Sequence, residues 1–541
     1  MEKRPTLWAA VACLAVIGLL PLLIMVVNSF VVGGGFSLKA YQALSESRRE
    51  QLTLMGNSLL LSLSVTFLAT TVGVALGIVL GKTDLPARRT LTALLTVPLL
   101  IPPYVIAVAW FAVLGSGGWM VSLAPETSKQ LSSVFFGFYG CTGVLLTAFM
   151  PIVILLTIAY VGAVNPQLED AGRLVSRWPG VLWRITLPLI APAILFAAVL
   201  VFLLTLGEVG VPTYLRYRVY PVETLTQFAA FYDFSAATAA AIPLLATTLA
   251  ILALEYAVLQ SRVSELRTVT FAVMRRQIVL GRWRIPLFAI VLVWTVATVI
   301  LPLAVLITQS WSVSGAYTDA FARASDSILR SFVFAVIGAS LLTLLGFFCG
   351  YLIHNRTLPV WRSVDALTLF LFTLPGTVIG IGLISLWNTP TTNFIYRTPA
   401  IIILGYLAQY AVLPTRMTSA LLDRLPSSLE QAAQLCGATW FMTLRHIVVP
   451  LATRGLIAVW VIGYVFCLRD LGISMVVYPP GSDTLPVRIL TLMANGSPSL
   501  IAALCVILVA ITLLPLGAVT LWLRRGLRHE HDRAARGVKG L

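Results

Sequence analysis

Two short stretches of this sequence carry residue types that could do chemistry. Gly77 to Thr83 reads G-I-V-L-G-K-T, which is similar to the end of a phosphate-binding loop, where backbone N–H groups and a lysine hold phosphates. It has one residue too few between its glycines and follows an apolar segment rather than a strand, so we exclude a nucleotide site. His529 to Asp532 could touch a metal, but its setting indicates a solvated basic tail. We therefore expect no catalytic residue and no metal ligand.

The cysteines give no further site. They are scattered, with no C-x-x-C and no paired spacing, at Cys13, Cys141, Cys349, Cys436, Cys467 and Cys505. Neither a disulfide framework nor a metal site is predicted from this pattern, and we interpret the six as small apolar side chains.

Glu208 and Asp470 are acidic residues near the ends of two apolar segments. One interpretation is an acidic pair at the mouth of a pathway, where carboxylate oxygens could meet a hard cation. The alternative, which we favour because charges at helix ends are commonly paired, is a set of local ion pairs. The candidate partners are Arg469 or Arg488 for Asp470, and Arg216 or Arg218 for Glu208.

Three prolines lie inside apolar segments, at Pro102, Pro103 and Pro375. Proline interrupts a helix, and a broken helix within a membrane is tolerated where it faces protein or a cavity. These residues are therefore candidates to line a translocation path, with a simple packing kink as the alternative.

The elements that carry these residues are membrane helices. The chain has 541 residues, of which 59% are hydrophobic and only 11% charged, and a mean hydropathy of +0.94. This composition predicts a polytopic membrane protein rather than a soluble one. The net charge of +16 is spread over short loops, so it indicates membrane topology and not a nucleic-acid-binding surface.

Apolar segments predict twelve transmembrane helices, each long enough to cross a bilayer core of about 30 Å. We place them at 7–30, 57–81, 90–115, 139–163, 188–211, 236–260, 285–309, 330–354, 364–387, 398–420, 450–473 and 498–523. The first lacks a clear A-x-A cleavage site, so we interpret it as an uncleaved span. Most Lys and Arg residues lie in the loops after even-numbered spans and in the two termini, which places both termini in the cytoplasm.

The two halves of the chain are repeats. At one constant spacing Ser58 corresponds to Ser331, and the same spacing relates the pairs Gly73/Gly346, Gly77/Gly350, Pro86/Pro359 and Pro102/Pro375. After a shorter outer loop in the second half, a second spacing relates Pro188/Pro450, Glu208/Asp470 and Gly210/Gly472. An even number of spans per half makes the repeats parallel. The predicted fold class is an all-α polytopic membrane protein built from two parallel six-helix repeats.

One cytoplasmic loop is present in both halves, at 165–188 and 427–450. The first copy contains E-D-A-G-R-L-V-S-R-W-P-G-V-L-W-R-I-T-L-P and the second Q-A-A-Q-L-C-G-A-T-W-F-M-T-L-R-H-I-V-V-P. Each copy is a polar, amphipathic stretch between two apolar segments. It ends at a proline, Pro188 or Pro450, at which the next apolar segment begins. The duplication predicts two equivalent docking surfaces.

These loops resemble the EAA signature, E-A-A-x-x-x-G, of the permeases of ATP-binding-cassette (ABC) importers. The matching residues are Glu169 and Ala171 in the first copy, and Ala433 and Gly437 in the second. The first copy departs from the signature with Val175 for glycine, so that Trp178 to Gly180 is a candidate for its turn. The second departs with Gln431 for glutamate, which Glu430 precedes by one residue. The resemblance implies that each loop forms a short coupling helix on an ATPase subunit.

Within that superfamily, the fused arrangement resembles the double-length iron(III) permeases, most closely in L-R-D-L-G-I-S-M-V-V-Y-P-P-G-S-D-T-L-P-V-R-I from Leu468 to Ile489. Permeases for aminoethylphosphonate, thiamine and polyamines share much of this pattern. The resemblance implies a bacterial inner-membrane transport subunit that is not itself an enzyme and binds no cofactor. Its expected partners are lipid, a periplasmic binding protein and an ATPase dimer that holds ATP and Mg.

The expected division is a first repeat at 1–262, a basic linker at 263–284, a second repeat at 285–523 and a basic tail at 524–541. An ion-coupled secondary transporter is a distant alternative, because such proteins usually need ionisable residues deep in the bundle and several spans here have almost none. A channel or scaffold would leave the duplicated loop unexplained.

Overall fold

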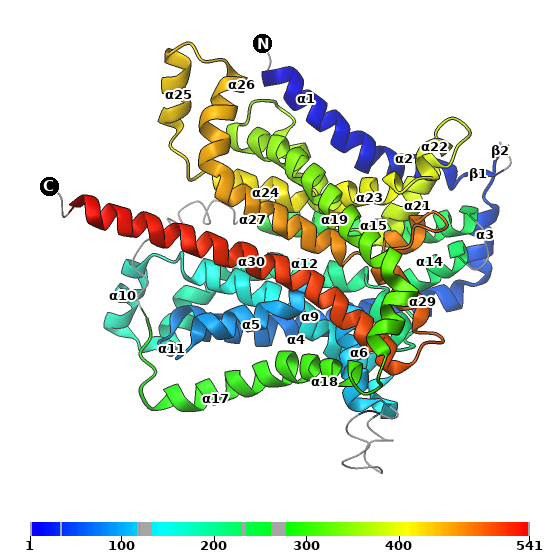
Figure 1. The fold of residues 1–541 in the computed structure, drawn as a ribbon, viewed down its shortest axis with the longest axis horizontal. Helices are drawn as coiled ribbons and strands as arrows, with labels where there is room; N and C mark the ends of the chain where they lie inside the picture. Colours follow the sequence, from blue (N-terminus) through cyan, green and yellow to red (C-terminus); the bar gives the residue numbers. More distant parts are fainter. Residues whose placement is uncertain are drawn as a thin grey trace.

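The computed structural model of this protein describes residues 3–32, 35–115, 118, 132–229, 234–260 and 277–538. In this described part, nine helices are long and apolar enough to cross a membrane, and three bent helix pairs raise the number to twelve. The all-α fold and the twelve predicted spans are thus confirmed (Figure 1). Residues 263–276 of the predicted linker and 539–541 of the predicted tail lie outside the described residues.

The first half contains three composite spans. Its first span joins α1 (Lys3–Leu14), a π-helical turn (Ala15–Leu19) and α2 (Leu20–Asn28). The others are α4 (Arg48–Lys82), α5 (Arg88–Leu100) with α6 (Pro103–Leu114), α9 (Phe138–Val161), α12 (Leu187–Leu206) and α15 (Phe234–Gln260). α11 (Trp178–Val181) and a π-helical turn (Leu182–Thr186) precede α12 in the same span. Outside the spans lie β1 (Val31–Val32), β2 (Gly35–Phe36), α3 (Lys39–Glu46), α10 (Pro166–Val175), α13 (Gly210–Tyr214) and α14 (Tyr220–Ala229).

The second half repeats this order. Its spans are α17 (Arg284–Thr295) with α18 (Leu301–Ser310), α19 (Ala316–Asn355), α20 (Trp361–Thr373) with α21 (Gly376–Trp387), α23 (Ala400–Tyr410) with α24 (Val412–Leu422), α27 (Val449–Leu468) and α30 (Pro498–Val538). Its shorter elements are a 3₁₀ turn (Gly281–Trp283), α22 (Asn393–Tyr396), α25 (Ser427–Leu435), α26 (Trp440–Thr443), α28 (Ser474–Val477) and α29 (Leu485–Leu492).

Several helix ends differ from the predicted spans. α4 and α19 start at Arg48 and Ala316, about two turns or more before the apolar runs, because polar residues continue a helix once it projects beyond the bilayer core. The fifth and eleventh spans start earlier, at Trp178 and Trp440. They reach Pro188 and Pro450 through π-helical turns (Leu182–Thr186 and Leu444–Val448), which accommodate the missing proline N–H.

Glycines at repeat-equivalent positions lie where helices come close together. A Cβ built at Gly77 would lie 2.6 Å from Thr157 on α9, and one at Gly346 would lie 2.4 Å from Pro414 on α24. No larger residue fits such distances, so α4 packs tightly on α9, and α19 packs tightly on α24.

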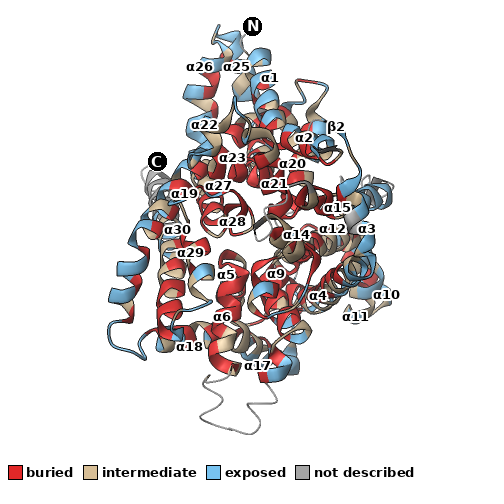
Figure 2. Ribbon diagram, turned by 90° about the vertical axis from the view of Figure 1, so that its right-hand side faces the viewer, coloured by how far each residue is buried: buried red, intermediate tan, exposed pale blue. Residues whose placement is uncertain are grey.

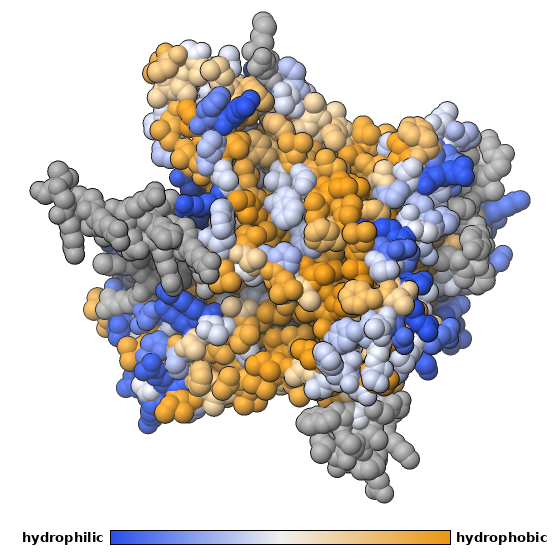
Figure 3. Space-filling model, viewed as in Figure 1, coloured by the Kyte–Doolittle hydropathy of each residue, from blue (hydrophilic) through white to orange (hydrophobic). Residues whose placement is uncertain are grey.

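Each first span packs on the opposite half, so the two halves interlock. α1 and α2 contact α19 and α21 of the second half, whereas α17 and α18 contact α5 and α6 of the first half. Figure 2 shows buried residues gathered in inner helices such as α5, α9 and α23. Figure 3 shows an apolar band across the middle of the molecule, with hydrophilic patches towards both ends, as expected of a protein that crosses a bilayer.

Candidate functional site

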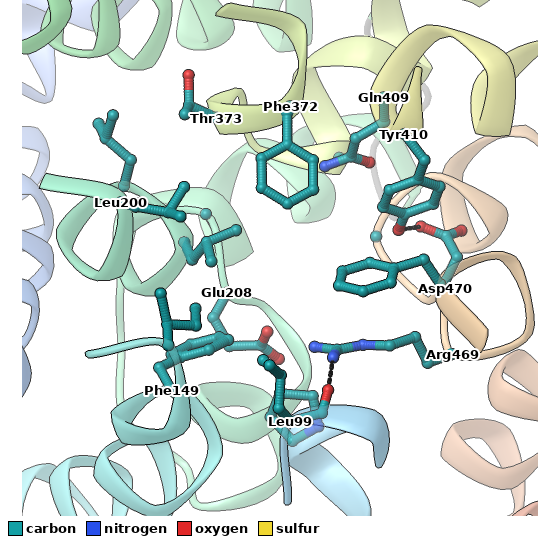
Figure 4. A pocket seen from close by; sticks show the side chains of 18 of the residues that line it. Leu99, Phe149, Leu200, Glu208, Phe372, Thr373, Gln409, Tyr410, Arg469 and Asp470 are labelled. Atoms are coloured by element: carbon teal, nitrogen blue, oxygen red, sulfur yellow. Dashed lines mark hydrogen bonds between the residues drawn. The ribbon is translucent and has the colours of Figure 1, made fainter. Parts of the chain in front are cut away.

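A central cavity of about 390 Å³ lies between the two halves, where the broken helices meet the ends of α12 and α27 (Figure 4). α5 and α6 bend by 103°, and α20 and α21 bend by 109°. Four of the five residues predicted at the pathway line this cavity, namely Pro103, Pro375, Glu208 and Asp470. The fifth, Pro102, immediately precedes α6 and is not among the lining residues.

Asp470 is fixed in the cavity wall by donors of its own half. Its Oδ1 accepts a hydrogen bond of 2.8 Å from the Tyr410 hydroxyl. Its Oδ2 accepts bonds of 2.9 and 2.7 Å from the backbone N–H and hydroxyl of Ser474. With both oxygens occupied, this carboxylate is a structural anchor at the end of α27.

Glu208 is held from one side only. Its Oε1 accepts hydrogen bonds from the N–H groups of Gly210 at 3.0 Å and Val211 at 3.4 Å. Among the described residues its Oε2 has no hydrogen-bond donor, and the carboxylate faces the cavity in Figure 4.

The local ion pairs that we favoured for these acids are wrong. Within the described part of the chain, neither Glu208 nor Asp470 forms an ion pair. The four candidate arginines have other contacts: Arg469 donates to the Leu99 carbonyl, Arg488 to the Arg323 carbonyl, Arg218 pairs with Glu50, and Arg216 lies over the Phe136 ring.

Arg469 is a cavity residue that sequence reasoning missed, because we considered it only as a partner for its neighbour. It extends from the second half into the cavity and donates to the Leu99 carbonyl of the first half (Figure 4). The available signal was the repeat, since Gly207 occupies the equivalent position. There a Cβ would lie 3.0 Å from the Cα of Pro375, so the first half has no room for a side chain where the second half has an arginine.

The first cytoplasmic loop forms α10 and α11. Glu169 is fully buried beneath α10, where it pairs with Lys82 at the end of α4 and accepts a hydrogen bond of 3.0 Å from Thr186. Ala171 and Val175 face outward. The buried carboxylate therefore fastens α10 to two membrane helices, rather than lying on the exposed face of the loop.

The second loop forms α25 and α26, with a different anchor. Glu430 accepts a hydrogen bond of 3.1 Å from the Tyr351 hydroxyl, which also accepts one of 3.1 Å from Trp440. Ala433 is buried and Gln431 is exposed. Glu430 thus provides the polar anchor in this copy. Its hydrogen-bond donor is the neutral Tyr351 hydroxyl, and the nearby lysine, Lys3, lies over the Tyr351 ring at 5.1 Å from its centroid.

The turns that follow α10 and α25 also differ. Gly437 has a φ of +78° and follows α25 in a glycine C-cap, with hydrogen bonds from Gly437 to Gln434 and from Ala438 to Ala433. After Val175 the chain instead leaves the helix through an extended Ser176, which needs no glycine. The turn that we considered for Trp178 to Gly180 is wrong, since these residues start α11.

Large apolar side chains are exposed on both loops. Leu174 and Val175 on the first loop are 88% and 89% exposed, and Leu435 on the second is 90% exposed. Phe441 and Met442 beside it are also exposed. Paired apolar surfaces at one end of the molecule are typical of a protein–protein interface.

The segment that precedes the second half contacts the base of the first loop. Ile278 pairs with Thr83 in a short β-bridge. Its N–H donates a hydrogen bond of 2.8 Å to the Lys82 carbonyl, and its carbonyl accepts one of 3.2 Å from the Asp84 N–H. The Leu280 N–H donates a hydrogen bond of 2.9 Å to the Asp84 carboxylate. The end of the linker is therefore bonded to the turn that holds the partner of Glu169.

Comparison with known proteins gives one family twice in the chain. The family model described as a binding-protein-dependent transport system inner membrane component matches residues 73–265 and again 342–529, together more than half of the sequence.

Three similar proteins are permeases. A ferric transport system permease protein of Haemophilus influenzae is 24% identical over 457 residues, which cover 80% of this chain and 71% of the relative. An Fe(3+)-transport system permease protein of the same species is 21% identical over 502 residues, or 90% of this chain and 93% of the relative. A 2-aminoethylphosphonate transport system permease protein of Salmonella typhimurium is 25% identical over 226 residues, which cover 40% of this chain and 85% of the relative.

Proposed function

Because this chain belongs to the family of binding-protein-dependent transport system inner membrane components, we propose that it serves an ABC importer that takes up ferric iron. It is a multi-pass transport subunit in which two permease repeats are fused. A separate binding protein would deliver the iron on the outer side, and a separate ATPase would supply the energy. Both termini and both duplicated loops would lie in the cytoplasm.

The observation that supports this proposal best is the pairing of two equivalent surface loops with a single cavity between the halves. α10 and α25 come from repeat-equivalent positions and expose apolar side chains. Closure of an ATPase dimer would draw the two loops together and rotate the interlocked halves around the cavity, and ATP hydrolysis would reset them. A channel needs no such pair of surfaces.

Ferric iron is the proposed cargo because two long matches, covering 80% and 90% of this chain, are to proteins described as ferric permeases. The aminoethylphosphonate permease matches only 40% of this chain, and it makes that cargo the first alternative, followed by thiamine or polyamines. An ion-coupled secondary transporter is a distant alternative.

The partner test is extraction in mild detergent followed by mass spectrometry of the proteins that co-purify. We expect a near-stoichiometric ABC ATPase, and the binding protein found with it can then be titrated with ferric iron, phosphonates and thiamine. A chain that is repeatedly isolated alone and moves solute down an ion gradient would overturn the importer assignment.

The coupling test is Gly437→Glu. A side chain at φ +78° is strained and a carboxylate alters the docking surface, so uptake should fall while ATP hydrolysis continues. Ala433→Glu should act in the same way, because Ala433 lies on the buried side of α25, where a carboxylate would displace the helix. Normal transport by a stably expressed Gly437→Glu protein would contradict this role of the loop.

A further inference from the structure

The central cavity presents one positive and one negative group to whatever occupies it. Figure 4 shows the Glu208 carboxylate and the Arg469 guanidinium pointing towards one another from opposite halves. Within the described chain no ion pair joins them, so a gap separates the two charges. The third charged group, Asp470, already has three donors and is not available to a ligand.

Unused hydrogen-bonding atoms belong to residues that line the cavity. Of the Arg469 nitrogens, only Nη1 has an acceptor among the described residues. The buried Tyr104 hydroxyl and the Gln409 Oε1 have no partner there either, and both residues line the cavity. A buried polar atom without a partner is costly, so these atoms indicate a site that a hydrated or oxygen-rich ligand satisfies.

The remaining wall is apolar, formed by residues such as Leu99, Phe149, Leu200 and Phe372. An apolar wall penalises a bare ion strongly, and penalises a complex with little net charge much less. The guanidinium adds a specific penalty, since a bare metal cation placed against Glu208 would lie close to a like charge. An anionic oxygen bound to the metal turns that repulsion into a charge-assisted hydrogen bond.

We propose that this cavity selects a metal cation that is coordinated by an oxyanion. Arg469 binds the anionic oxygens, Glu208 faces the cationic centre, and ferric iron therefore crosses together with its anion. This inference rests on the proposed function as a ferric importer, and it assigns to Arg469 the discrimination between a complexed ion and a bare one.

The experiment uses the complete transporter, with its ATPase and binding protein, in proteoliposomes. The binding protein is loaded with radiolabelled iron and, in parallel arms, with radiolabelled phosphate or citrate, and both labels are counted in the lumen. We expect ATP-dependent entry of about one anion per iron in at least one arm, and the two arms distinguish the sources of the oxyanion.

Arg469→Met should lower iron uptake about tenfold or more, the usual effect of removing a hydrogen bond to a charged group. Arg469→Lys should retain part of the uptake because it keeps the charge. The matched control is Arg488→Met, which removes an arginine that bonds the Arg323 carbonyl outside the cavity lining and should leave uptake unchanged. Elution as a single species on size-exclusion chromatography checks that each variant is folded.

Iron uptake at the normal rate without either anion would overturn the inference and leave the importer function intact, as would wild-type uptake by Arg469→Met. The wild-type anion-to-iron ratio decides the question even if a variant does not fold. Absence of any ATP-dependent iron uptake by the wild-type transporter would overturn the ferric assignment, and this inference with it.

Discussion

The two signature acids, Glu169 and Glu430, hold the duplicated loops in different ways. Glu169 is buried with a lysine and a threonine, whereas Glu430 is half-buried and bonds a tyrosine hydroxyl. A buried ion pair depends on both partners, because removing one leaves an uncompensated charge in a medium of low dielectric constant. A hydrogen bond to a neutral hydroxyl depends much less on its partner. The two loops are therefore held in place with unequal strength.

Lys82→Met should accordingly destabilise the protein by about 3–5 kcal/mol, and loosen α10 enough to uncouple ATP hydrolysis from uptake. Tyr351→Phe, the corresponding change at the second loop, should cost only about 1 kcal/mol. Thermal unfolding in detergent and the ratio of ATP hydrolysed to solute transported measure the two effects. Equal losses in the two variants would show that the loops are fastened equally.

Sequence reasoning located the loop residues but not their contacts. The resemblance to the EAA signature identified Glu169 and Gly437, because a signature depends on residue type and order. It could not show that Val175 precedes an extended residue rather than a glycine turn. It could not identify Arg469 as a cavity residue either, since that depends on where the second half meets Leu99 of the first.

Hydropathy predicted the presence of the membrane helices, but it predicted their ends and bends only in part. Apolar length predicts a span because the bilayer core has a fixed thickness, and the breaks at Pro102 and Pro375 follow from proline chemistry. The 50° bend between α23 and α24 was not predicted. Pro414 lies in the first turn of α24 and leaves the Tyr410 carbonyl without its usual donor, which accounts for this bend.

The linker end is an element that hydropathy cannot place, since a β-bridge at Ile278 has no apolar signature. Ile278→Pro removes the N–H that donates to Lys82, so we expect a loss of about 1 kcal/mol and weaker coupling through the first loop. The neighbouring Val279 is exposed, and no hydrogen bond of its N–H is among those recorded in the described segment. Val279→Pro therefore serves as the matched control, read by thermal unfolding and by ATPase coupling. Equal effects of the two prolines would show that the bridge contributes nothing.

The repeats make the molecule nearly symmetric around its cavity, with departures from symmetry at the cavity and at the loops. Arg469 corresponds to Gly207. Lys82, which pairs with Glu169, corresponds to Asn355 by the repeat spacing, and the second loop is instead anchored by Tyr351. Separate permease halves could exchange partners, whereas a fused chain fixes which half carries each feature. Fusion thus permits the second half to supply the Arg469 charge in the cavity while the first half carries the loop that is held by the buried Lys82–Glu169 pair.

The orientation of the whole molecule in the membrane can be tested with its own cysteines. Cys436 is exposed at the end of α25, so a membrane-impermeant maleimide should label it in inside-out vesicles and leave it unlabelled in right-side-out vesicles, if the loops are cytoplasmic as the charge distribution predicts. Cys13 is also exposed but lies within the apolar first span, where lipid would cover it. Four further cysteines are buried. Cys436→Ser should abolish the labelling, and Cys13→Ser should preserve it. Labelling of Cys436 in right-side-out vesicles would show that the topology is the reverse of the proposed one, with both loops out of reach of a cytoplasmic ATPase.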